Sequence, residues 1–148
     1  MQGDAKDIVS AYDWPRPVAP GAERGGVSVE GLGLSSQSHG RVTVVAVRGE
    51  LDAVTSREFD DYLTSARRHS DRIILDLAAV EFMDTSSLAV IVGHWKKLTA
   101  SNGILALAGA RYRYTKTLWI TGLADRLPRY DTLEQAIAAV SDGDGNGG

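Results

Sequence analysis

The stretch from Val80 to Leu98, VEFMDTSSLAVIVGHWKKL, constrains the fold of this chain more than any other stretch. It is a short apolar run that ends in Asp84, followed by hydroxyl residues and then by apolar residues at helical spacing. The spaced apolar residues are Leu88, Ile91, Val92, Trp95 and Leu98. The pattern predicts a buried strand that leads into a helix with one buried face, and Asp84 can cap that helix.

The hydroxyl residues Thr85, Ser86 and Ser87 fall in the first turn of this helix. Backbone N–H groups in a first turn lack helical partners, and the helix dipole favours negative charge there. The fold would therefore tolerate a phosphate at this position. The same residue types are also preferred as helix caps for structural reasons alone. Spacing by itself leaves open both a pure cap and a site of modification.

The rest of the chain alternates between strand and helix patterns. Strands are predicted at 27–34 and 42–47, joined as a hairpin by the polar turn SSQSHG, and at 72–77, 104–108 and 127–130. The strand at 42–47 is predicted to end before Gly49–Asp52, which would form the segment that follows it. Further helices are predicted after Thr55 and Asp131, each with a Glu at capping-box spacing, and over 112–121. The fold class is therefore α/β: an N-terminal hairpin, then β-α-β-α-β-α, forming a mixed sheet with helices packed on it.

The two ends of the chain lack this periodicity. Residues 1–25 contain three of the four prolines, and we predict a disordered or loosely docked arm in which Trp14 can dock on the domain or stay exposed. Residues 142–148, DGDGNGG, are predicted to be a flexible tail. One domain over residues 26–141 lies between them.

Composition excludes several classes of function. The chain has no cysteine, no apolar run near the ~20 residues of a membrane span, and a net charge of -3. We therefore expect a cytoplasmic protein with no membrane insertion and no direct nucleic-acid partner. Asp142, Asp144 and Asn146 imitate a calcium loop that lacks its final Glu, so no metal or other cofactor is expected. His94 is interpreted as an ordinary packed or surface histidine, and no catalytic residue or enzyme activity is predicted.

Four motifs together resemble a known family. GELD at Gly49–Asp52, RIILDL, FMDTSSL at Phe82–Leu88 and TGLADRL at Thr121–Leu127 are similar, in order and spacing, to the STAS-domain anti-sigma factor antagonists. The resemblance covers roughly Val27 to Val140. In that family the residue after the Asp of the central junction is the phosphoacceptor, which corresponds to Thr85 here, with Ser86 as the alternative.

The resemblance implies a partner-switching function. Unmodified family members bind an anti-sigma factor, a serine/threonine kinase of the histidine-kinase-like ATPase fold, and so free a sigma factor. The kinase phosphorylates the antagonist, the complex weakens, and a phosphatase resets the switch. By resemblance the partner-binding residues are Asp52, Asp84, Thr85, Ser86 and Ser87; a loop-end or capping role for Asp52 is the alternative.

Two residues depart from the family pattern, and other functions remain open. Ser87 stands where the family usually has Gly, and the acceptor is Thr85 rather than the commoner Ser. A non-phosphorylated STAS subunit of a transport complex and a small-ligand or nucleotide sensor are the alternatives. The oligomeric state is open. The basic residues Arg111, Arg113, Lys116, Arg126 and Arg129 are interpreted as a solvated face, with contact to an acidic partner as the alternative.

Overall fold

A six-stranded mixed sheet forms the centre of the molecule. The computed structural model describes residues 27–29, 31–113 and 115–146. Its elements are β1 (Val27–Val29), β2 (Leu32–His39), β3 (Val42–Leu51), α2 (Ser56–His69), β4 (Arg72–Met83), α3 (Thr85–Ala100), β5 (Ile104–Ala108), α4 (Lys116–Ile120), the 3₁₀ helix η1 (Leu123–Asp125), β6 (Arg129–Tyr130) and α5 (Leu133–Asn146). The strand order is β1-β2-β3-β4-β5-β6. The predicted α/β class is confirmed; residues 1–25 lie outside the described residues.

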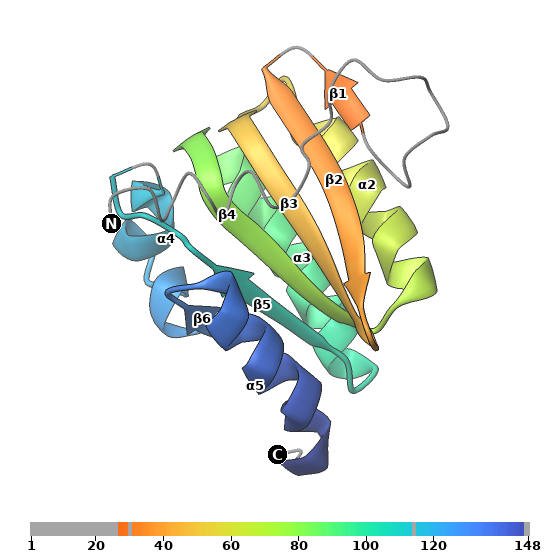
Figure 1. The fold of residues 1–148 in the computed structure, drawn as a ribbon. Coiled ribbons are helices and arrows are strands. Elements are labelled where there is room, and N and C mark those ends of the chain that lie inside the picture. The colour runs from red at the N-terminus through yellow and green to blue at the C-terminus, as the bar shows by residue number, and fades with distance from the viewer. Residues whose placement is uncertain (1–26, 30, 114, 147–148) are drawn as a thin grey trace, which may run out of the picture.

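The strand directions bring the carboxyl ends of the parallel strands to one edge of the sheet. The strands β1, β2 and β3 pair antiparallel, whereas β3, β4, β5 and β6 pair parallel. Figure 1 shows α2 and α3 behind the sheet and α5 in front of it. Since β3, β4 and β5 run in one direction, their carboxyl ends and the loops that follow them lie at a common edge.

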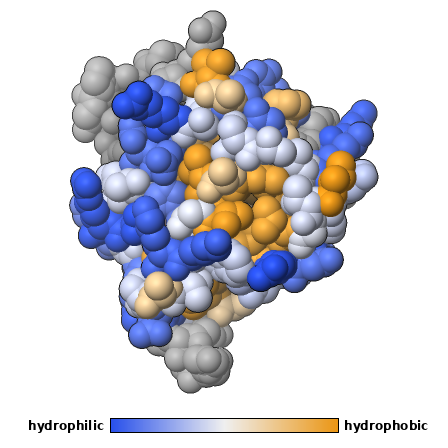
Figure 2. All heavy atoms as spheres, turned by 180° about the vertical axis from the view of Figure 1, so that it is seen from behind, coloured by the Kyte–Doolittle hydropathy of each residue, from blue (hydrophilic) through white to orange (hydrophobic). Residues whose placement is uncertain are grey.

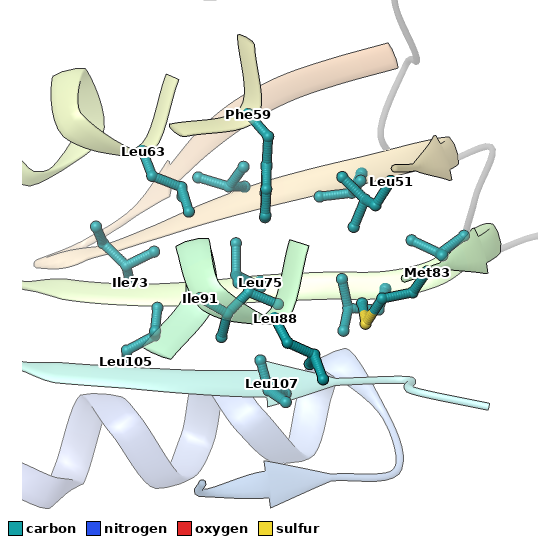
Figure 3. Close-up of a cluster of buried hydrophobic side chains, with 14 of the residues drawn as sticks. Leu51, Phe59, Leu63, Ile73, Leu75, Met83, Leu88, Ile91, Leu105 and Leu107 are labelled. Atoms are coloured by element: carbon teal, nitrogen blue, oxygen red, sulfur yellow. The ribbon is translucent and has the colours of Figure 1, made fainter. Parts of the chain in front are cut away.

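Strand alternation divides the core into two layers. On the α2 and α3 side, leucine, isoleucine and phenylalanine side chains pack together (Figure 3): Leu51, Phe59, Leu63, Ile73, Leu75, Met83, Leu88, Ile91, Leu105 and Leu107. On the other side, α5 packs through Ala136 and Val140 on small residues such as Ala106 and Ala108. Small side chains on that face let a single helix lie close to the strands.

The hairpin is confirmed, but its turn lies elsewhere than predicted. The segment SSQSH is not a turn: it is the second half of β2 and pairs with β3 from Ser35↔Ala46 to His39↔Val42. The reversal is made by Gly40 and Arg41, with Gly40 at φ 65°. Strand β3 also continues through Leu51, so Gly49–Leu51 does not leave the strand as predicted. Polar composition was misleading here because backbone pairing with β3 decides the conformation.

Two predicted capping boxes are wrong. Thr55 is the N-cap residue of α2, as its position predicted, but its buried side chain makes no capping hydrogen bond; its Oγ1 donates to the Glu50 carbonyl oxygen at 3.0 Å. At the start of α5, the cap is Thr132 rather than Asp131, because the Gln135 amide donates to Thr132 Oγ1 at 3.1 Å. A Thr or Asp three residues before a Glu occurs both where its side chain caps the helix and where it does not, and only the local backbone conformation distinguishes the two cases.

Several helix and strand lengths also differ from prediction. The predicted helix over 112–121 is only Lys116–Ile120, followed by the separate 3₁₀ turn. The strand predicted at 72–77 continues through the next apolar run to Met83. The last strand is Arg129–Tyr130 and begins after Pro128, and α5 extends to Asn146, into the predicted tail.

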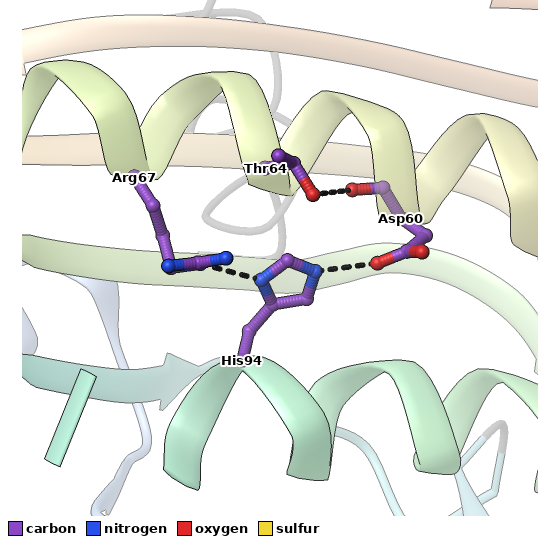
Figure 4. Close-up of polar contacts among 4 residues, drawn as sticks. All are labelled: Asp60, Thr64, Arg67 and His94. Atoms are coloured by element: carbon purple, nitrogen blue, oxygen red, sulfur yellow. Dashed lines mark hydrogen bonds and ion pairs between the residues drawn. The ribbon is translucent and has the colours of Figure 1, made fainter. Parts of the chain in front are cut away.

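A polar network joins α2 to α3 next to the core (Figure 4). His94 of α3 is buried; its Nε2 lies 2.6 Å from Asp60 Oδ1 of α2, and the Arg67 Nε donates to its Nδ1 at 2.8 Å. An arginine can only donate, so Nδ1 must accept and the imidazole is neutral, with its proton on Nε2. His94 is thus a packed histidine, as predicted, with a structural role between two helices.

This network predicts a pH-dependent stability. Burial lowers the pKa of His94; the hydrogen bond to Asp60 acts against this, and the charges of Arg67 and Lys97 add to it. The unfolded chain therefore binds a proton at higher pH than the folded chain does. The contribution of neutral His94 to the free energy of unfolding is complete above its ordinary pKa of 6.5 and is lost as the pH falls through the lower pKa of the folded state.

As the pH falls from about 7.5 to about 5, we expect the free energy of unfolding to decrease less in His94→Gln than in the wild type. Urea unfolding followed by circular dichroism at both pH values measures the difference. His69→Gln is the control, since His69 is exposed at the end of α2. An equal pH dependence in the wild type and His94→Gln would contradict the role of this histidine.

Candidate functional site

The candidate site lies where β3 and β4 end side by side. Leu51 and Met83 are register partners, and each is the last residue of its strand. Asp52 and Asp84 directly follow them, and the Asp84 amide donates to the Leu51 carbonyl oxygen at 3.0 Å. The two acidic loops predicted to matter for partner binding are therefore tied together by the sheet and by a backbone hydrogen bond.

Asp84 is the N-cap of α3, as predicted. Its Oδ1 accepts from the backbone amides of Ser86 at 3.0 Å and Ser87 at 3.2 Å. Burial raises the pKa of Asp84, but these bonds and those from the two serine hydroxyls outweigh it and hold the pKa below its ordinary value. The carboxylate is therefore ionised at neutral pH and fixes the first turn of the helix.

The hydroxyl groups in this turn have different environments. The Ser86 Oγ donates to Asp84 Oδ1 at 2.6 Å, and the Ser87 side chain is fully buried, with its Oγ 3.4 Å from the same oxygen. Thr85 is exposed, and among the described residues its hydroxyl forms no hydrogen bond. Thr85 thus presents the most accessible hydroxyl of the turn, whereas Ser87 offers no surface to a partner.

Asp52 organises the loop between β3 and α2. Its Oδ1 accepts from the backbone amides of Val54 and Thr55, both at 3.0 Å, and from Thr55 Oγ1 at 3.2 Å. Within the described part of the chain, the hydrogen bonds to the carboxylates of Asp52 and Asp84 all involve Oδ1. The Oδ2 of each carboxylate can therefore accept a hydrogen bond from another molecule.

Apolar side chains surround these two loops. In the described residues, all the exposed large hydrophobic side chains lie on segments at or next to this edge: Val54 (81% exposed), Phe82 (49%), Tyr112 (54%) and Ile120 (73%). Val54 follows Asp52 by two residues and Phe82 precedes Asp84 by two. Exposed apolar side chains gathered in one region are typical of an interaction surface. The sequence pattern gave no signal for the exposure of Val54, Phe82 and Ile120.

The outer face of α3 extends this apolar character. Viewed from behind, the side of the molecule formed by α2 and α3 has an apolar area in its middle with a hydrophilic border (Figure 2). On α3 itself, Ala89 is exposed and Val92 is half-buried, whereas Val90 and Trp95 pack against the core and remain partly exposed. The amino-terminal half of this face, with Ala89 and Val92, is less polar than the outer face of a typical surface helix, whereas the carboxyl-terminal half carries exposed Lys96 and Lys97.

We expect Asp84→Ala to lower the free energy of unfolding by about 1 to 2 kcal/mol, because the amides of Ser86 and Ser87 lose their acceptor. Urea unfolding measures it. Asp131→Ala is the matched control and should change stability by less than about 0.5 kcal/mol, since Asp131 is exposed and Thr132 makes the cap. Equal losses in the two variants would contradict the capping assignment.

The described residues contain no group of three or more His, Cys, Asp or Glu side chains that could hold a metal ion. In that same part of the chain, no helix has the length and apolar character needed to cross a membrane.

Comparison with known proteins identifies the family. The model of the STAS domain matches residues 34–136, so the chain belongs to the STAS domain family. It is 32% identical over 111 residues to the anti-sigma F factor antagonist of Paenibacillus polymyxa, covering 74% of this chain and 95% of that protein. It is 33% identical over 95 residues to an anti-sigma-B factor antagonist of Staphylococcus aureus, covering 64% and 88%.

A solved structure agrees with this assignment. The crystal structure of an anti-sigma factor antagonist from Mycobacterium paratuberculosis superimposes with a TM-score of 0.69 at 28% identity, covering 75% of this chain and 95% of that one. The chain therefore spans nearly the whole length of relatives that are anti-sigma factor antagonists.

Proposed function

We propose that this chain is an anti-sigma factor antagonist that binds an anti-sigma kinase when unmodified and is released when Thr85 is phosphorylated. The observation that carries the proposal is the first turn of α3: an exposed Thr85 hydroxyl at a helix N-terminus, directly after the ionised cap Asp84. In this proposal the chain is a substrate and a ligand of the kinase, and a phosphatase reverses the modification.

The hydrogen bonding favours Thr85 over Ser86 as the acceptor. Ser86 Oγ already donates to Asp84 Oδ1 at 2.6 Å and is half-buried. Phosphorylating it would remove that hydrogen bond and bring a charge of about -1.5 to -2 against the carboxylate. A phosphate on exposed Thr85 leaves the cap intact, and the helix dipole offsets part of its repulsion with Asp84.

The proposed kinase-binding surface combines the carboxylates with the apolar residues around them. Asp52 and Asp84 supply free carboxylate oxygens. Val54, Phe82 and Ile120 supply apolar area, together with Ala89 in the amino-terminal half of α3. Interfaces of this composition, apolar with a few placed charges, are typical of protein partners. Ser87 has no place in it as a contact because it is fully buried.

Binding to candidate kinases tests the proposal. The purified chain is titrated by calorimetry with each histidine-kinase-like anti-sigma factor encoded in the same genome. We expect at least one to bind, and Val54→Ser with Ile120→Ser to weaken that complex by about tenfold or more. Ala138→Ser, on the exposed side of α5, is the control. If no such kinase binds, the proposal is wrong and a transport-complex subunit becomes the better interpretation.

A further inference from the structure

The connection between β5 and β6 is strongly basic although the chain as a whole is acidic. We call residues 109–130, which comprise this connection and the two residues of β6, the basic connection. Its charged residues are Arg111, Arg113, Lys116, Arg126 and Arg129 against the single acidic residue Asp125, a formal charge of +4. The whole chain has a formal charge of -3. Such a separation of charge creates a positive potential over one part of the surface and steers partners of opposite charge.

The basic connection is held next to the proposed acceptor. Thr117 Oγ1 of α4 donates at 3.3 Å to the carbonyl oxygen of Met83, the residue before Asp84. Leu118 is fully buried and Leu127 is 3% exposed, both in the core cluster beneath α3. Helices α3 and α4 contact each other. The segment is thus a fixed neighbour of the first turn of α3.

A side-chain hydrogen bond and aromatic packing hold described parts of the basic connection. Thr115 is fully buried, and its Oγ1 donates to the Arg111 carbonyl oxygen at 2.6 Å. Tyr112 packs edge-on against Trp119, whose ring also contacts the Arg129 guanidinium at 4.4 Å. Lys116 and Arg126 are exposed. Arginine interleaved with exposed aromatic residues is characteristic of protein interfaces.

We infer that the basic connection docks an acidic segment of the same partner that binds the Thr85 surface. The inference rests on the proposed function and adds the chemistry of the partner. The edge of the sheet is then bipolar, with Asp52 and Asp84 in the β3 and β4 loops and the basic connection after β5. A bipolar surface fixes the orientation of a partner, because the reversed orientation sets like charges against each other.

The inference also explains why a phosphate on Thr85 would release the partner. A partner that places carboxylates on the basic connection has negative charge close to the first turn of α3. A phosphate there repels those carboxylates and lowers the positive potential that attracted them. Release then needs no change in the fold of either protein.

Charge reversal tests the inference. Association of the wild type, of Lys116→Glu with Arg126→Glu, and of Arg68→Glu with Lys97→Glu is measured by surface plasmon resonance. The analytes are the same panel of anti-sigma kinases, at about 50 and about 300 mM NaCl. The second pair is the matched control: it makes the same change in net charge at exposed positions in the last turns of α2 and α3. Thermal melting checks that both pairs fold.

We expect the first pair to slow association by about tenfold at low salt and to lose most of the salt dependence, with less than about twofold change in the control pair. Binding that is equally affected in both pairs, or in neither, overturns the inference and leaves the proposed function intact. Binding by no kinase overturns both. Binding of a short single-stranded DNA that only the first pair loses would assign the surface to nucleic acid instead and also overturn the inference.

Discussion

We expect Gly49→Ala to lower the free energy of unfolding by about 3 kcal/mol or more, a large fraction of the total stability of a small domain. Gly49 has φ 97°, and a Cβ added there would lie 2.2 Å from the Gly31 carbonyl oxygen. The backbone cannot easily give way, because that oxygen accepts from the Glu50 amide at 2.7 Å. The glycine of the GELD motif is therefore required by the close approach of the β1–β2 turn to β3.

Gly93→Ala is the matched control for this prediction. Gly93 lies within α3, and an added Cβ would meet no atom within 4 Å. The same substitution should therefore stabilise the protein by about 0.5 to 1 kcal/mol, the gain expected for a helical glycine. Urea unfolding of both variants measures the two effects. A loss below about 1 kcal/mol in Gly49→Ala would show that the turn can move away.

We expect phosphorylation of Thr85 to lower the affinity for the kinase by about 10-fold to 10⁴-fold. One pair of charges at ~6 Å is worth about 0.7 kcal/mol at water-like screening and about 3 kcal/mol at an effective dielectric of 20. A phosphate carries nearly twice that charge, and each 1.4 kcal/mol changes affinity about tenfold. The acidic partner segment inferred above would provide the opposing charge.

Calorimetric titration of the phosphorylated and unmodified chains measures this effect. The fold should be unaffected, because Thr85 is exposed at a helix N-terminus, so melting temperatures of the two forms should agree within a few degrees. Equal affinity of the two forms would contradict electrostatic release. A large fall in melting temperature on phosphorylation would mean that release follows from unfolding of α3 instead.

Long apolar patterns made much of the fold predictable. The pattern around Leu88 and Ile91 predicted α3 and its buried face, and Asp84 was correctly predicted as its cap. The alternation of strand and helix patterns predicted the parallel part of the sheet. In that topology an Asp follows each of two neighbouring parallel strands, so Asp52 and Asp84 lie at the same edge of the sheet.

Features that depend on tertiary contacts were missed. Polar Ser35–His39 is strand because it pairs with β3, which polar composition does not indicate. The Thr55 side chain makes no capping bond to α2 because its hydroxyl bonds back to the Glu50 carbonyl oxygen. The exposure of Phe82 was also missed: neighbouring strand residues point to opposite faces of a sheet, so Phe82 lies on the other face from buried Met83.

Phosphate mapping tests the central claim most directly. The chain is incubated with ATP and each candidate anti-sigma kinase, and its intact mass and phosphopeptides are measured beside Thr85→Ala and Ser86→Ala. We predict a single added phosphate that is lost in Thr85→Ala and kept in Ser86→Ala, because Ser86 Oγ is already bonded to Asp84. A phosphate lost only in Ser86→Ala, or no phosphate with any kinase that binds, would contradict a switch at Thr85.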